Sequence, residues 1–146
     1  MDKFLEAAIE EARKGLDEGG IPIGSVLVHE GEIIGRGHNR RMQNGSVVLH
    51  GEMDALENAG RLPAKTYRES TIYTTLSPCP MCSGAILLYG IPRVVIGEST
   101  TFLGAEDWLE QKGVTLERND NAECKALMQT FITAHPDEWN EDIGES

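Results

Sequence analysis

Two short motifs constrain this chain more than any other feature, because they place ligands for one metal ion in segments that are far apart in the sequence. The first is His-Gly-Glu at residues 50–52, and the second is Pro-Cys-Pro-Met-Cys at residues 78–82. One imidazole and two thiolates are ordinary zinc ligands. Any fold of the chain must therefore bring His50 to the same ion as Cys79 and Cys82.

Both motifs are expected to begin helices. The free amides and aligned peptide dipoles of a helix N-terminus favour negative charge, so thiolates are stabilised there. Cys79 and Cys82 are three residues apart, and with Cys79 at the cap both sulfurs can face one ion from a single turn. The segment between the motifs is long enough for a helix, a connection and a strand, so His50 can return to the same point from a neighbouring helix.

Three protein ligands leave one position of a tetrahedral zinc for water, which is typical of a catalytic site and not of a structural one. A water on zinc loses its proton near neutral pH and can attack a ring carbon that bears an amine. Glu52 follows His50 by two residues, about 200° around a helix, so it is expected to face the substrate and carry protons. The pattern H-x-E…P-C-x-x-C is typical of zinc-dependent nucleobase deaminases. We therefore predict one catalytic Zn²⁺ per chain, with Glu52 as the catalytic residue.

A closed structural zinc site would need a fourth protein ligand. Four side chains are candidates for that position: Cys124, His29, His38 and His135. Cys124 falls on the apolar stripe of its expected helix and is interpreted as core packing, and the two histidines nearest the N-terminus are interpreted as strand side chains. A non-catalytic, zinc-stabilised interaction domain stays open as an alternative, and it would have no role for Glu52.

Hydrophobic periodicity predicts strands that alternate with helices after an initial hairpin. Helices are expected at residues 4–16, 50–59, 81–89, around 108–109 and at 124–131, and strands at residues 23–30, 32–38, 71–75, 93–97 and 114–117. The helix at 81–89 is apolar almost all round and is expected to be buried. This order indicates one α/β domain over residues 1–146, a three-layer α/β/α sandwich with a mixed central sheet of about five strands.

The charge balance argues against a nucleic-acid partner. Twenty-four acidic side chains outnumber 13 basic ones and produce a formal net charge of −11, which repels phosphate backbones unless a local basic patch overcomes it. The nearest candidate, Arg36 with Arg40 and Arg41, is interpreted as a solvated strand end. The sequence contains no run of about 18 apolar residues, so it predicts no membrane span. The cysteine pattern favours a reducing cytoplasm, with a nuclear pool left open.

Several segments resemble fungal cytosine deaminases, which belong to the cytidine and deoxycytidylate deaminase superfamily, and together they extend along most of the chain. These segments are Gly-Gly-Ile-Pro-Ile-Gly at 19–24, Gly-Arg-Gly-His-Asn at 35–39, Leu-His-Gly-Glu at 49–52, Thr-Thr-Leu-Ser-Pro-Cys at 74–79 and Tyr-Gly-Ile-Pro-Arg at 89–93. The tail Trp-Asn-Glu-Asp-Ile-Gly-Glu at 139–145 resembles the lid of the free-base enzymes. The resemblance implies a cytidine deaminase-like fold, a homodimer, and residues 136–146 as an active-site lid. It also implies hydrolysis of cytosine to uracil and ammonia in pyrimidine salvage.

The same resemblance implies which residues bind a free pyrimidine base. The polar edges would meet Asn39, the Gly51 amide, the Ser77 carbonyl and Asp142, with the first two at N1 and O2 and the last two near the exocyclic amine. The ring would be covered by Phe102 and Trp139, with Ile23 and Leu76 in the pocket wall. An unsubstituted N1–H is a donor that a nucleoside lacks, so we expect the site to exclude sugars.

Two other deaminases share the expected fold and metal motif. A tRNA adenosine deaminase is one alternative and a guanine deaminase is another. The negative net charge disfavours an RNA substrate.

Overall fold

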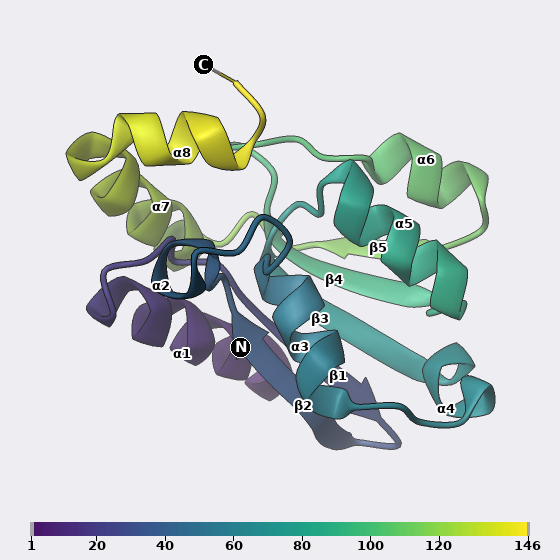
Figure 1. Cartoon of the computed structure of the whole chain (residues 1–146). Helices are drawn as coiled ribbons and strands as arrows, with labels where there is room; N and C mark the ends of the chain where they lie inside the picture. The colour runs from purple at the N-terminus through teal and green to yellow at the C-terminus, as the bar shows by residue number, and fades with distance from the viewer. Residues whose placement is uncertain (1, 146) are drawn as a thin grey trace.

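The computed structural model describes residues 2–145. A five-stranded mixed sheet lies at its centre, with the strand order β2-β1-β3-β4-β5 (Figure 1). β1 is antiparallel to both of its neighbours, whereas β3, β4 and β5 are parallel. The strands are β1 (Gly24–His29), β2 (Glu32–His38), β3 (Ser70–Leu76), β4 (Arg93–Glu98) and β5 (Thr115–Arg118).

The tight turn between β1 and β2 consists of Glu30 and Gly31, which both adopt positive φ, at 50° and 78°. A two-residue hairpin turn of this kind matches the right-handed twist of the strands it connects. The predicted hairpin is therefore confirmed. All the other predicted strands are also present, and β5 starts one residue later than expected.

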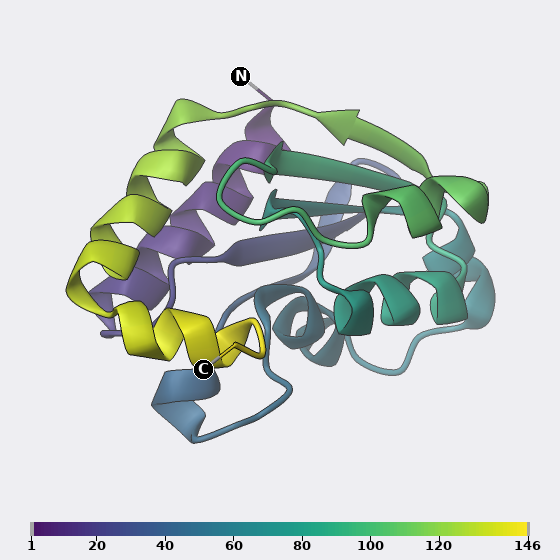
Figure 2. The same cartoon turned by 90° about the horizontal axis from the view of Figure 1, so that it is seen from above.

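Helices lie on both sides of the sheet (Figure 2). The helices that correspond to predicted ones are α1 (Lys3–Asp17), α3 (Gly51–Ala59), α5 (Pro80–Tyr89), α6 (Glu106–Gln111) and α7 (Ala122–Ala134). The sequence did not predict α2 (Arg41–Asn44), α4 (Ala64–Arg68) and α8 (Pro136–Asp142). None of the helices in residues 2–145 has the length and apolar character that crossing a membrane requires.

The alternation of side chains along β1 explains the layers. Val26 and Val28 belong to a core cluster with α1 and Cys124 of α7, whereas Leu27 belongs to a cluster with α5 and α6 on the opposite face. Successive side chains of a strand point to opposite faces, so a strand that is apolar throughout needs helices on both. The predicted three-layer α/β/α sandwich is confirmed.

Two expectations about exposure were wrong. α5 is not buried all round, because only one of its faces packs against the sheet, and Leu88 and Tyr89 on its outer side are 75% and 45% exposed. Arg41 is not part of a solvated strand end, because it is only 8% exposed and forms an ion pair with Glu141 of α8. Hydrophobic periodicity does not indicate which side of an apolar helix packs against the sheet. It also does not indicate which acidic residue, distant in the sequence, pairs with a given basic residue.

Candidate metal centre and active-site pocket

Both halves of the metal motif cap a helix, as predicted. His50 is the N-cap residue of α3 and Cys79 is the N-cap residue of α5, each with extended backbone dihedrals. The Cys79 sulfur accepts a hydrogen bond from the backbone N–H of Cys82 at 3.5 Å, and Pro80 begins the helix where no backbone donor is needed. Local capping therefore aims Cys79 toward its neighbour one turn later.

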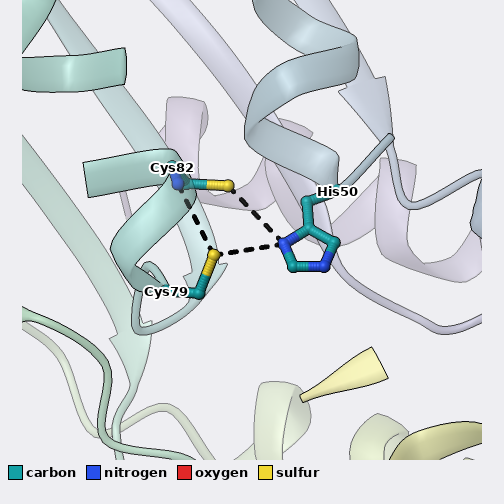
Figure 3. A group of neighbouring side chains, drawn as sticks. All are labelled: His50, Cys79 and Cys82. Atoms are coloured by element: carbon teal, nitrogen blue, oxygen red, sulfur yellow. Dashed lines mark hydrogen bonds between the residues drawn. The ribbon is translucent and has the colours of Figure 1, made fainter. Parts of the chain in front are cut away.

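The three side chains converge with the spacing of a tetrahedral metal site (Figure 3). Nδ1 of His50 lies 3.3 Å from the Cys79 sulfur and 3.6 Å from the Cys82 sulfur. With ordinary zinc–sulfur and zinc–nitrogen bond lengths, a tetrahedral ion holds such atoms about 3.6 Å apart. All three ligand atoms lie within 4.8 Å of one another. The residues present therefore fit zinc.

The four candidates for a fourth ligand lie elsewhere. Cys124 packs in the core beneath α1, and His38 is bridged by Glu11 and Glu18 at 2.9 and 2.8 Å. The other two candidates also lie beside glutamates, with Nε2 of His29 3.5 Å from Glu69 and Nδ1 of His135 3.3 Å from Glu138. These contacts give each candidate a structural role away from His50.

The charges of the metal-free site form a coupled network. Burial opposes a positive charge on His50, but hydrogen bonds to Asp142 and Cys79 outweigh it and raise the pKa of His50 to about 10. Hydrogen bonding with Cys82, then with His50, lowers the pKa of Cys79 to about 4 against the effect of burial. The neighbouring Cys79 and burial raise the pKa of Cys82 well above its ordinary value. Zinc needs a neutral imidazole and two thiolates, so it competes with protons on His50 and Cys82.

Glu52 is buried on the first turn of α3, with only 3% of its surface exposed. Burial, followed by the negative charge of Cys79, raises the pKa of Glu52 to about 7. A carboxyl group that titrates near neutral pH can both accept and donate a proton during a reaction. Its environment therefore suits the proton-carrying role predicted from the sequence.

A pocket of about 470 Å³ opens beside these residues. Six of the eight predicted substrate-binding residues line it, which are Ile23, Leu76, Ser77, Phe102, Trp139 and Asp142, together with His50, Glu52 and Cys79. The rings of Phe102 and Trp139 meet edge to face at 6.3 Å and 90°. The mainly apolar wall with a few converging polar groups is typical of a small-molecule site.

The other two predicted residues lie directly behind this wall. Asn39 is fully buried, and its Nδ2 donates to Oδ2 of Asp142 at 3.0 Å. Gly51 lies against Ile23, the residue before β1, where an added Cβ would lie 3.0 Å from the Ile23 carbonyl oxygen. Glycine thus allows the start of α3 to approach the strand closely.

The part of the chain that contains the metal motif is similar to a known protein family. Residues 1–98 match the family described as the cytidine and deoxycytidylate deaminase zinc-binding region, and this segment contains His50, Glu52, Cys79 and Cys82. The chain belongs to the cytidine and deoxycytidylate deaminase family.

Relatives within this deaminase family act on different substrates. Cytosine deaminase of Candida albicans is 56% identical over 144 residues, covering 98% of this chain and 96% of that protein. A tRNA-specific adenosine deaminase of Streptococcus pyogenes is 40% identical over 140 residues, covering 88% of this chain and 87% of that protein. The resemblance to fungal cytosine deaminases is thereby confirmed.

Solved structures share the deaminase fold. One from a study of A-to-I editing by tRNA:A34 deaminases superposes with a TM-score of 0.74 at 28% identity, covering 87% of this chain and 99% of that one. A guanine deaminase from Nitrosomonas europaea has a TM-score of 0.73 at 23% identity and covers 89% of this chain and 83% of its own. These likenesses agree with the predicted cytidine deaminase-like architecture.

The sequence did not indicate Glu106, a buried residue that binds the pocket residue Ser77. This carboxylate is 3% exposed and accepts hydrogen bonds from Ser77 Oγ at 2.6 Å, from Arg118 Nε at 2.7 Å and from the Ser99 hydroxyl. Burial opposes its charge, but these hydrogen bonds lower the pKa of Glu106 overall. Ser77 Oγ in turn accepts from the Gly104 amide at 2.9 Å. The loop that contains Phe102 is therefore tied to Glu106 through Ser99 and to Ser77, the residue after β3, through Gly104.

Sequence reasoning also missed Arg41 and Glu141, which both line the pocket. The available signal was weak, because it consisted of a basic residue after β2 and an acidic tail a hundred residues later. Opposite charge alone does not identify partners in a chain with 24 acidic residues.

Proposed function

We propose that this chain is a zinc-dependent cytosine deaminase that converts cytosine and water into uracil and ammonia. The observation that carries the proposal is the three-ligand site of His50, Cys79 and Cys82 beside a pocket that contains buried Glu52. The 56% identity to a Candida albicans cytosine deaminase over nearly the whole chain supports cytosine as the substrate.

His50, Cys79 and Cys82 would hold one zinc ion, which supplies a Lewis acid that makes water nucleophilic near neutral pH. Glu52 takes the proton of the attacking water and delivers it to the ring nitrogen next to the reacting carbon. The same carboxylate then takes the second proton of that water and delivers it to the departing amine, so that ammonia leaves and a carbonyl remains. Burial raises the pKa of Glu52, which favours a carboxyl group that both accepts and donates a proton.

The pocket would bind the base by shape and by its polar edges. Phe102 and Trp139 cover the ring, and the apolar side chains Ile23 and Leu76 support it. The polar edges meet Asn39, the Gly51 amide, the Ser77 carbonyl and Asp142. Residues 136–146 act as a lid, and α8 is the part of this segment that carries Trp139 and Asp142.

Deamination of adenosine in tRNA is the second candidate, because the Streptococcus pyogenes relative is 40% identical over most of the chain. The net charge of −11 opposes binding of an RNA backbone. An ammonia-release panel with cytosine, cytidine, adenine, guanine and a tRNA anticodon stem-loop, run with and without chelator, discriminates the candidates. We expect ammonia release from cytosine alone, and we expect chelation to abolish it. Ammonia release from the stem-loop alone would instead identify the chain as a tRNA deaminase.

The non-catalytic alternative makes a different prediction in the same panel. A zinc-stabilised interaction domain would bind the metal but release no ammonia from any substrate. Its zinc would also bind no small anion, because a structural site has four protein ligands and no position for water.

We further propose that the enzyme is a homodimer of the cytoplasm, with a nuclear pool, that functions in pyrimidine salvage without nucleic-acid or membrane partners. Large apolar side chains exposed along α5 and α6 support self-association: Leu88, Tyr89 and Trp108, with Leu103 in the loop before α6. Light scattering tests the dimer, and Leu88→Glu is expected to shift the mass to that of one chain. A monomeric mass for both the wild type and Leu88→Glu would refute the homodimer.

A further inference from the structure

Arg41 connects the pocket wall to α8 through a bidentate ion pair. Its Nη1 and Nη2 donate to the two carboxylate oxygens of Glu141 at 2.7 and 2.8 Å, and its Nε donates to the Val47 carbonyl at 3.0 Å. The guanidinium side chain is 7% exposed, whereas that of Glu141 is 67% exposed. A bidentate pair of this kind fixes direction as well as distance.

The same short segment also holds the next residue of α8. Asn39 accepts a hydrogen bond from the Arg41 backbone N–H at 3.0 Å and donates its own amide to Asp142 at 3.0 Å. Nη1 of Arg41 lies 3.5 Å from the same oxygen of Asp142. Asn39 and Arg41 thus bind two successive carboxylates, and we call this set of contacts the clasp.

The clasp is placed at the end of α8 that covers the pocket. α8 follows α7 and begins at Pro136, whereas the clasp contacts Glu141 and Asp142 at its C-terminal end. At the middle of α8, Trp139 packs in a core cluster with Met128 and Phe131 of α7. Beyond the clasp, the chain turns at Gly144 with φ of 77°. Apolar packing of Trp139 therefore anchors α8 near its middle, and polar contacts hold its final turn.

We propose that Arg41 is a positioning residue that holds α8 closed over the pocket and thereby sets the fraction of enzyme ready to bind the base. This inference rests on the proposed function, because it assigns Arg41 to that same site. One partner of the ion pair is solvated, so the clasp can open and close during exchange of substrate and product. The apparent dissociation constant equals the intrinsic one divided by the closed fraction. Loss of the clasp therefore raises KM more than it lowers kcat.

The test compares four zinc-loaded variants with the wild type: Arg41→Gln, Arg41→Lys, Glu141→Gln and the double variant with both glutamines. Arg93→Gln is the matched control, because Arg93 pairs with Glu117 at 2.6 Å at the start of β4. That position is at the opposite end of the parallel strands from Ser77. Steady-state kinetics on cytosine and amide hydrogen exchange of residues 136–145 without substrate are measured for each.

We expect Arg41→Gln to raise KM about fivefold to tenfold with kcat within about threefold, and to speed exchange in α8 by a similar factor. Arg41→Lys restores part of the loss, since an ammonium can meet one carboxylate oxygen but lacks the planar fork. The double variant matches Arg41→Gln, because each single change already breaks the same contact. Arg93→Gln behaves as the wild type.

Wild-type exchange in α8 for both Arg41→Gln and Glu141→Gln would overturn the clasp, as would fully multiplicative effects on KM in the double variant. Glu141 is largely exposed, so Glu141→Gln keeps the test valid if Arg41→Gln does not fold. Absence of ammonia release from cytosine by the wild type would refute the proposed function alone. The exchange measurements need no substrate and would still decide whether Arg41 holds α8.

Discussion

The carboxylate of Asp142 lies 3.2 Å from Nε2 of His50, on the side of the imidazole ring that faces away from the two cysteine sulfurs. A residue of α8 therefore contacts a proposed metal ligand directly. Carboxylates in this position fix the orientation of a ligating imidazole and increase its basicity. The C-terminal segment is thus connected to both the pocket and the metal centre.

Removing this carboxylate should weaken the metal site. We expect Asp142→Asn to lower zinc affinity by about 10- to 100-fold, because such supporting partners have effects of that size. Competition with a chromophoric chelator measures the affinity. Glu138→Gln is the control, since Glu138 lies on the same helix but its carboxylate is near His135 and not His50, and equal zinc affinities of Asp142→Asn and the wild type would contradict the prediction.

Glu52 should be needed for turnover and not for metal binding. Glu52→Gln is expected to retain one zinc per chain while kcat falls by at least about 10²- to 10⁴-fold, the range of general acid–base catalysis. Metal analysis and ammonia release are measured on the same preparation. Turnover of the variant within a few fold of the wild type would exclude Glu52 as the proton carrier.

Zinc affinity should rise with pH. The raised pKa values of His50 and Cys82 mean that the metal-free site carries protons on both groups near neutral pH, whereas Cys79 with a pKa of about 4 is already a thiolate. Zinc binding must release those protons, so the association constant should increase by about 100-fold per pH unit between pH 6 and 8. Titration in buffers of different ionisation enthalpy counts the protons released. A pH-independent affinity over this range would disprove the proton competition.

Glu106 should maintain the shape of the pocket. In Glu106→Gln the carboxylate that accepts from Ser77, Ser99 and Arg118 becomes an amide with one acceptor oxygen. We expect a loss of about 1–3 kcal/mol of unfolding free energy and a higher KM, because Ser77 and the loop bearing Phe102 lose their common partner. Glu110→Gln is the control, since Glu110 also pairs with Arg118 but at an exposed site. Matching stabilities of the two variants would rule out the bracing role.

The buried cluster around His38 should make stability depend on pH. Hydrogen bonding to Glu11, against burial, raises the pKa of His38, so its contribution is full below the unfolded value of 6.5 and falls as pH rises through the folded pKa. Burial opposes the charge of Glu11, but His38 and Arg36 lower its pKa to about 2, so its contribution is lost as pH falls from 4.5 toward 2. The Tm difference between wild type and His38→Asn should therefore be largest between about pH 4.5 and 6.5. A difference that grows from pH 6.5 to 9 would contradict this assignment.

Sequence reasoning succeeded where the chemistry is local. The caps at His50 and Cys79, the hairpin at Glu30 and Gly31, and the alternation along β1 depend on residues only a few positions apart. It failed for α5, because an apolar helix has no polar face to indicate which side stays exposed, as Leu88 does. It also failed for short helices such as α8, because a few residues do not define a period.

The sequence by itself determined which residues can hold the metal and move the proton, since His50, Glu52, Cys79 and Cys82 are set by motif spacing and helix caps. Only the tertiary structure decided how α8 meets this centre. Arg41 and Glu141 are 100 residues apart, and Asn39 and Asp142 are 103 apart. Charge complementarity is not selective among many acidic residues, so these pairs exist because packing of Trp139 against α7 brings the last turn of α8 over the pocket.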